Sequence, residues 1–358
     1  MLKSGWLICA LLLAACGAKK SALTEQEKKA VIGATTDIKS RCIGRYLIDF
    51  PASAQPIGDA KFDDVRVNAK AMSLEQFKHD MLALEAELKA THSTLGYQFF
   101  FDAGTVGGME HAKYFISLGD PGASNDARRV IEAYRWDRGY QLSLKIKAVD
   151  WTNSKFKDAS IVKSGPVKTN VPEKKQLAFD LITKLQGRPE DEIPTEPGTC
   201  FVGGFMPGKA ISEKEAVSTS YVLADKSDVS FNWDSFAGLQ ATSTLLPRIR
   251  STDVQDALKT AQGHVIRSGS IELPSGMKVD EALISSLTLV NVQGSHGSLE
   301  TNYQGSPEAP YIVFDMLTAS PNFLAQADTV KRSSLTEGEA LALWDAVSRS
   351  LRPRPNAF

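Results

Sequence analysis

Two short segments of this chain share one plan, and this repetition constrains the fold more strongly than any other feature of the sequence. Residues 41–51 read RCIGRYLIDFP, and residues 199–207 read TCFVGGFMP. Each segment contains a cysteine, a glycine two or three residues later, an aromatic–aliphatic pair and a closing proline. Because proline cannot donate to a strand ladder, each segment is predicted to begin a strand that the proline ends.

The sequence after each opening segment repeats one order of elements. In the first half, one helix is predicted after Ser73, with Gln76 placed for a capping box, and another near Pro172. The second half has a predicted helix at 252–262 and a last helix that starts with Thr336 and Glu339, the residues of a capping box. Strands are predicted at 97–101, 112–118, 129–136 and 141–148 in the first half, and at 270–273, 277–292, 298–304 and 310–316 in the second. We therefore expect the α+β class, with two similar domains, each an antiparallel sheet with helices packed on one face.

A polar segment separates the two halves. Residues 186–198, QGRPEDEIPTEPG, are rich in proline, glycine and acidic residues and lack apolar periodicity, which is typical of a domain boundary. The acidic run 190–192 is expected to be solvated. The predicted organisation is a lipoprotein signal peptide at 1–15, a tether and entry helix at 16–35, an N-terminal domain at 36–187, a linker at 188–195 and a C-terminal domain at 196–358.

The N-terminus has the features of an export signal. Lys3 precedes an apolar run, residues 6–15, which is too short to span a bilayer of about 30 Å and ends in small residues. The tetrad LAAC at 13–16 resembles the lipobox of bacterial lipoproteins, in which the cysteine, here Cys16, is acylated and begins the mature chain. The alternative is an ordinary signal peptide with an accidental cysteine. Gly17 stands where an aspartate would favour the inner membrane, so we expect a periplasm-facing protein tethered to the outer membrane.

The four cysteines divide into two groups. Cys9 leaves with the signal peptide and Cys16 carries the lipid, so Cys42 and Cys200 remain in the exported chain. Paired thiols persist as disulfides in an oxidising compartment, and two cysteines allow one intramolecular pairing. A Cys42–Cys200 disulfide is therefore predicted. Two buried, unpaired cysteines, one in each domain core, are the alternative.

Composition and motifs argue against nucleic-acid binding and catalysis. The chain is 42% hydrophobic and 23% charged with a formal net charge of −1, which is ordinary for a globular protein and lacks the basic balance of nucleic-acid binders. None of the five histidines lies in an HExxH motif, and no GxSxG pentad is present. His296, in the run GSHG at 294–297, is expected in a hairpin turn. We expect no catalytic residue, no metal site and no cofactor, so the protein is predicted to act by binding.

The paired openings resemble those of the two-domain immunity proteins that are cognate to lipase effectors of type VI secretion. The resemblance implies that the chain binds a phospholipase toxin in the periplasm through both domains and obstructs the active-site entrance or lid of the toxin. A disulfide between the two openings would fix the domains as one rigid claw and lower the ordering cost of binding. The matching positions are expected to be scaffold residues: Gly44, Tyr46, Pro51, Gly203 and Phe205.

Two other functions stay open at this point. A generic outer-membrane lipoprotein, acting as an assembly factor or a small-ligand-binding module, would have a deep apolar pocket within one domain or a partner in the envelope. A periplasmic hydrolase would bring a serine, a histidine and an acid within hydrogen-bond reach of one another.

Overall fold

The computed structural model describes residues 24–25, 29, 32–33, 36–165, 168–301 and 304–358. The predicted signal peptide, the predicted lipidation site Cys16 and most of the predicted tether lie outside the described residues. Among the described helices, none is long and apolar enough to cross a membrane.

The two halves share one order of strands: four strands, one or two helices, four strands, one or two helices and a short last strand. The first half comprises β1 (Ile38–Ile43), β2 (Tyr46–Pro51), β3 (Ala54–Phe62), β4 (Val65–Ala71), α2 (Leu74–Ala90), β5 (Phe100–Thr105), β6 (Ala112–Ser117), β7 (Arg128–Asp137), β8 (Tyr140–Val149), α3 (Ser160–Ser164), α4 (Val171–Lys184) and β9 (Gln186–Gly187). The second comprises β10 (Gly198–Phe201), β11 (Gly204–Pro207), β12 (Glu215–Leu223), β13 (Lys226–Phe236), α5 (Leu245–Arg250), α6 (Thr252–Thr260), β14 (His264–Glu272), β15 (Lys278–Leu287), β16 (Gln293–Glu300), β17 (Tyr311–Leu317), α7 (Glu337–Ser348) and β18 (Arg352–Pro353). The predicted α+β class with two similar halves is confirmed.

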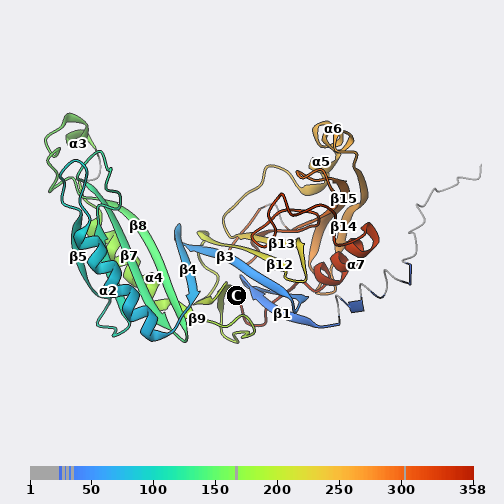
Figure 1. Ribbon diagram of the computed structural model, residues 1–358, viewed down its shortest axis with the longest axis horizontal. Helices are drawn as coiled ribbons and strands as arrows, with labels where there is room; N and C mark the ends of the chain where they lie inside the picture. The colour runs from blue at the N-terminus through green and yellow to red at the C-terminus, as the bar shows by residue number, and fades with distance from the viewer. Residues whose placement is uncertain (1–23, 26–28, 30–31, 34–35, 166–167, 302–303) are drawn as a thin grey trace, which may run out of the picture.

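A single twelve-stranded antiparallel sheet runs through both halves. Its order is β14-β15-β16-β17-β13-β12-β3-β4-β8-β7-β6-β5, which reads the same from either end when equivalent strands are matched. At the centre, β3 pairs with its equivalent β12, and Gly58 lies opposite Thr219. The halves are therefore related by a pseudo-two-fold axis at this strand pair. In Figure 1 they form two arms that meet at β3 and β12 and diverge towards α3 in one arm and α5 and α6 in the other.

Each half also completes the opening hairpin of the other. The last strand of the first half, β9, pairs with β11, and the last strand of the second half, β18, pairs with β2. Two three-stranded sheets result, one built on each opening segment. The two halves thus exchange their last strands, in addition to sharing the central sheet.

The helices of the first half cover both faces of the sheet, which differs from the expectation of one covered face. Ile131 of β7 packs in the cluster that contains Leu181 of α4, whereas Tyr134 of the same strand packs with Phe77 of α2. Residues three apart in a strand point to opposite faces, so α2 and α4 lie on opposite sides. Strands β6 and β7 bury side chains on both faces, and the second apolar face needs a second helix.

The two predicted capping sites differ in completeness. At the start of α7, the Thr336 hydroxyl accepts from the Glu339 amide while the Glu339 carboxylate accepts from the Thr336 amide, so the full capping box forms as predicted. At the start of α2, the Ser73 hydroxyl accepts from the Gln76 amide. The Gln76 side chain instead donates to Asp80, so only half of that box is present.

Candidate interaction surface

The two opening segments form hairpins of equivalent register. Cys42 lies opposite Leu47 in β1–β2, and Cys200 lies opposite Phe205 in β10–β11. Each hairpin has a two-residue loop with one residue in the left-handed region, Gly44 at φ +56° in the first position of its loop and Gly203 at φ +70° in the second. Glycine adopts this conformation without steric cost. The different loop positions explain why the glycine follows the cysteine by two residues in one segment and by three in the other.

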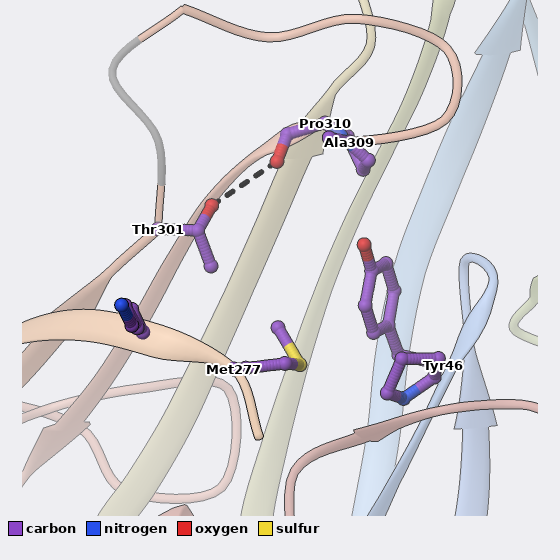
Figure 2. A pocket seen from close by; sticks show the side chains of 7 residues that line it. Tyr46, Met277, Thr301, Ala309 and Pro310 are labelled. Atoms are coloured by element: carbon purple, nitrogen blue, oxygen red, sulfur yellow. Dashed lines mark hydrogen bonds between the residues drawn. The ribbon is translucent and has the colours of Figure 1, made fainter. Parts of the chain in front are cut away.

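The scaffold residues Tyr46 and Pro51 both belong to β2. Pro51 is the last residue of the strand. The Tyr46 ring lies beside a pocket of about 300 Å³ whose lining includes Met277, Thr301 and Pro310, and Figure 2 shows the ring facing these side chains. Burial raises the pKa of the Tyr46 hydroxyl to about 12, against the opposing charge of Arg45. Tyr46 therefore stays neutral and serves as a packing residue.

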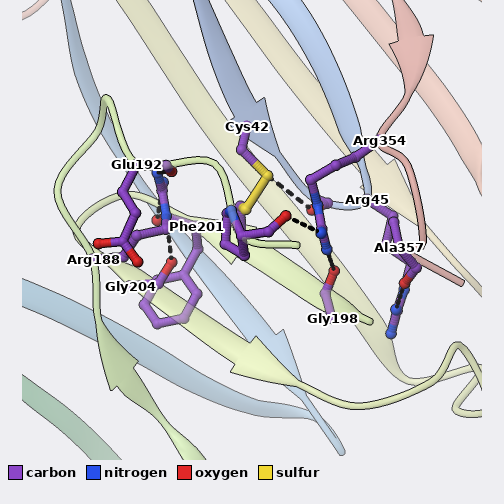
Figure 3. Close-up of a disulfide and its surroundings, with 12 residues drawn as sticks. Cys42, Arg45, Arg188, Glu192, Gly198, Phe201, Gly204, Arg354 and Ala357 are labelled. Atoms are coloured by element: carbon purple, nitrogen blue, oxygen red, sulfur yellow. Dashed lines mark hydrogen bonds between the residues drawn. A yellow bond between two sulfur atoms is a disulfide. The ribbon is translucent and has the colours of Figure 1, made fainter. Parts of the chain in front are cut away.

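The two cysteines meet at the junction of the halves. In the structure their sulfur atoms are bonded, with the Cα atoms 5.7 Å apart. The backbone of Gly44 exchanges two hydrogen bonds with that of Cys200, each 2.8 Å long, so the two hairpins also pair directly. The bridge is buried with Leu47 and Phe205. It joins equivalent residues of the two halves and thus lies near the pseudo-two-fold axis (Figure 3).

Two buried arginines at equivalent positions support the bridge, and the sequence analysis missed them. Arg188 directly follows β9 and Arg354 directly follows β18. Arg188 donates to the carbonyls of Pro189, Glu192, Phe201 and Gly204, and Arg354 donates to those of Pro194, Glu196 and Gly198. Figure 3 shows them on opposite sides of the bridge. An Arg-Pro dipeptide after each closing helix, at 188–189 and 354–355, is the sequence signal that marks both.

A third arginine, Arg45, ties the first hairpin to the second half. Its guanidinium pairs with Glu215 at 2.8 Å and donates to the carbonyls of Gly208 and Ala357. Burial, together with the charges of Arg45 and Arg188, lowers the pKa of Arg354 to about 10. The main-chain carbonyls compensate this crowding of positive charge. We call the two hairpins, the bridge and the three arginines the hub.

The predicted linker is part of the hub. Arg188 is fully buried, and Glu190 accepts hydrogen bonds from the Gly203 amide at 3.0 Å and from the Tyr221 hydroxyl at 3.1 Å. The expectation of a solvated acidic run is therefore wrong at Glu190. Polar composition here reflects hydrogen bonding inside the junction, which a sequence pattern does not distinguish from solvation.

The hub covers one face of the central strands. Phe50 of the first hairpin stacks on Tyr221 with ring centroids 4.5 Å apart, and Phe201 of the second approaches Phe62 at 6.1 Å. On the opposite face the alternate residues of these strands are exposed or half-buried. We call this surface the open face, and its members include Ile57, Asp59, Arg66, Lys70, Ser218, Ser220, Asn232, Asp234 and Asp315.

The open face is electrostatically asymmetric. Arg66 and Lys70 of β4 are exposed on the first-half side, whereas three carboxylates lie at the centre and on the second-half side. Asp59 and Asp234 both lie opposite Ser218, one on each neighbouring strand. Burial raises the pKa of Asp234; a hydrogen bond from Ser218 lowers it, and the charges of Asp315 and Asp59 raise it again. Asp59 already pairs with Arg66 at 3.5 Å, so the negative charge of the open face lies mainly on the second-half side, at Asp234 and Asp315.

The histidine nearest these carboxylates was placed wrongly by sequence. His296, expected in a hairpin turn, lies inside β16, and its Nε2 atom is 3.4 Å from the Asp315 carboxylate. Within the described residues, no group of histidine, cysteine and acidic side chains is arranged to hold a metal ion.

Two family models match the chain and together span both halves. The model described as Tle cognate immunity protein 4 N-terminal domain matches residues 39–188, and the corresponding C-terminal domain model matches residues 192–356. No curated protein matches the sequence.

Solved structures of immunity proteins share the fold. The apo structure of the immunity protein TplEi of a type VI secretion system from Pseudomonas aeruginosa has a TM-score of 0.66 at 20% identity, covering 89% of this chain and 98% of that chain. A crystal structure of a Tle4–Tli4 complex gives a TM-score of 0.66 at 20% identity, covering 90% and 99%. TplEi complexed with an "L" peptide gives 0.63 at 19% identity, covering 89% and 99%.

Proposed function

This chain belongs to the Tle cognate immunity protein 4 family, and from that membership we propose that it binds and inhibits a cognate lipase effector of a type VI secretion system. The proposal rests on the match of both domain models to consecutive parts of this chain, residues 39–188 and 192–356. The family implies an inhibitor without catalysis of its own.

We further propose that inhibition is by occlusion of the active-site entrance or lid of the effector. The hub holds the two arms as one body, so little conformational freedom remains to be lost on binding. Stable inhibitory complexes bury about 1,600 Å² in total. The open face crosses five neighbouring strands from both halves, in the order β4, β3, β12, β13 and β17. The asymmetric charge of the open face would orient the effector.

The location at the membrane is a proposal from the sequence alone. The lipobox at Cys16 would attach the chain to the outer membrane on its periplasmic side, beside the lipid that a phospholipase attacks. Export would also provide the oxidising environment in which the Cys42–Cys200 bridge persists.

Binding of a small ligand is less well supported. The hypothesis required a deep apolar pocket within one domain. A cavity of about 540 Å³ in the first half has a mixed lining, in which four charged side chains join apolar ones: Asp102, Arg129, Asp150 and Lys175, with Phe101, Ile116, Val171 and Pro172. The charged groups already pair with one another: Lys175 with Asp102 at 3.0 Å and Arg129 with Asp150 at 3.5 Å.

Co-elution with the lipase encoded beside the gene tests the proposed function. The mature chain and the lipase should elute as one complex in size-exclusion chromatography; separate elution would overturn the proposal. Ile57→Arg on the open face should weaken the complex at least tenfold. Ile193→Arg is the control, because Ile193 lies in the segment 188–195 that belongs to the hub on the other face of the sheet, and it should leave the complex unchanged. Ile57 is 51% and Ile193 38% exposed. Equal binding by both variants would remove the open face from the interface while leaving the function intact.

A further inference from the structure

Three large apolar side chains gather on two neighbouring loops of the second half. Leu289, in the loop between β15 and β16, is 98% exposed, and Phe323 and Leu324, in the loop after β17, are 44% and 40% exposed. The two loops share a buried cluster in which Val290 packs with residues of 319–330. This buried cluster holds both loops in place beneath the three exposed side chains. We call Leu289, Phe323 and Leu324 the loop patch.

The loop after β17 lies close to the point where the tether joins the fold, and Leu289 lies farther along the same end of the sheet, beside the end of α6. Three hydrogen bonds connect the start of β1 with the loop after β17 through the turns that lie between them. The Asp37 carbonyl accepts from the Ala52 amide, and the adjacent Ser53 carbonyl accepts from the Ala224 amide in the β12–β13 turn. At the start of β13, the Ser227 carbonyl accepts from the Asn322 side chain, directly before Phe323.

Charged groups beside the loop patch are compatible with a lipid headgroup region. Lys331 and Arg332 are exposed in the same loop. Of the nearby carboxylates, Asp225 pairs with Lys226 at 2.7 Å, and buried Asp228 accepts from the amides of Ala319 and Ser334. Asp328 is the exposed acid of this loop. Solvent-exposed positive charge therefore lies next to exposed apolar tips, the combination found in interfacial membrane anchors.

We propose that the loop patch inserts into the lipid bilayer and gives the tethered protein a second membrane contact. This inference rests on the proposed anchoring at Cys16. Residues 16–35 would attach the fold to the membrane by the end that bears the patch, so the local concentration of lipid at these loops would be high. Burial of exposed leucine and phenylalanine in the acyl boundary is favourable. The second contact would orient the arms relative to the membrane.

Vesicle flotation tests the proposal without the acyl anchor. The mature chain carrying Cys16→Ser is mixed with vesicles of phosphatidylethanolamine and phosphatidylglycerol, and the bound fraction is measured. We expect binding that falls at least tenfold in the triple variant Leu289→Ser, Phe323→Ser and Leu324→Ser. The control Ile211→Ser changes a side chain that is 82% exposed at the opposite end of β12 and should bind as the parent does. All variants should unfold at the same temperature, because each change is at the surface.

Two results would overturn the proposal: no vesicle binding by the Cys16→Ser chain, or equal binding by the triple variant. Lipase inhibition, measured with a soluble substrate, separates this proposal from the proposed function. The triple variant should inhibit as the parent does. If it binds vesicles normally and loses inhibition, the loop patch contacts protein and not lipid. If no variant inhibits, the proposed function fails while the vesicle result still decides the role of the patch.

Discussion

At the scale of single residues, the hub depends on buried guanidinium groups that serve main-chain carbonyls. A buried arginine is tolerated when its donors are matched by acceptors, and each unmatched buried carbonyl costs free energy once the arginine is removed. Arg354 supplies donors to three carbonyls of the segment between the halves. Arg354 therefore stabilises the junction between the halves and not one particular helix or strand.

Arg354→Met should lower the free energy of unfolding by about 1–3 kcal/mol, because the buried carbonyl of Gly198 and two partly buried carbonyls lose their donors. Chemical denaturation followed by circular dichroism measures the change. Arg66→Met removes an exposed guanidinium of the open face and should cost less than about 0.5 kcal/mol. Equal losses in the two variants would show that the buried hydrogen bonds are not what stabilises the junction.

Asp234 predicts a pH dependence of opposite sign to that of most carboxylates. Its pKa in the folded protein is raised above the ordinary 3.8, so the folded state holds the proton more tightly than the unfolded state. The stabilisation is present below the unfolded pKa and is lost as the pH rises through the folded pKa. Asp234→Asn should therefore raise the melting temperature at neutral pH and flatten its rise on mild acidification. An unchanged or lowered melting temperature at neutral pH would contradict this account.

At the scale of elements, sequence reasoning predicted the helices and the outer strands of each half but missed the central strands. Each opening segment was predicted as one strand, whereas it folds into a two-stranded hairpin around its glycine. The closing helices have clear signals in their first-turn residues and apolar stripes. The central strands β3, β4, β12 and β13 were not predicted. β3 contains Pro56 and Gly58, residues that usually interrupt strands, and its partner β12 belongs to the other half of the chain. Such long-range pairing leaves little local pattern.

Gly58 is required for the central strand pair and not for a turn. A Cβ atom at this position would lie 2.3 Å from the Ser218 carbonyl oxygen and 2.7 Å from the Thr219 Cα atom, both main-chain atoms of β12. Gly58→Ala should therefore lower the free energy of unfolding by about 1–3 kcal/mol, the usual cost of overpacking. Gly269→Ala in edge strand β14 is the control, since a Cβ there meets nothing within 4 Å. Thermal unfolding of both variants measures the difference, and equal stability would refute the close contact.

At the scale of the whole molecule, the duplicated halves act as one body because they are joined three times. The central sheet, the exchanged end strands and the bridge all cross the pseudo-two-fold axis. The sequence predicted the halves and the cysteine pairing, since both follow from short local motifs. It did not predict the exchange of β9 and β18, the hub arginines or the open face, because these depend on how distant segments pack.

The bridge should contribute strongly to whole-molecule stability. It spans 158 residues, and loop-closure entropy for a cross-link of that span gives up to about 5 kcal/mol. The exported protein should be lighter than its reduced form by two hydrogen atoms in intact mass analysis. The Cys42→Ala and Cys200→Ala double variant should melt at a lower temperature. Two free thiols in freshly exported protein would contradict the bridge, while the sheet and the arginines would still join the halves.

Titration of the cognate lipase with this protein tests the central claim most directly. If the chain is an immunity protein that occludes its effector, lipase turnover should fall in proportion to the protein added until it is abolished. The Arg354→Met variant should need a higher concentration for the same effect, because its arms are held less firmly. Full lipase activity in the presence of excess unsubstituted protein would contradict the account.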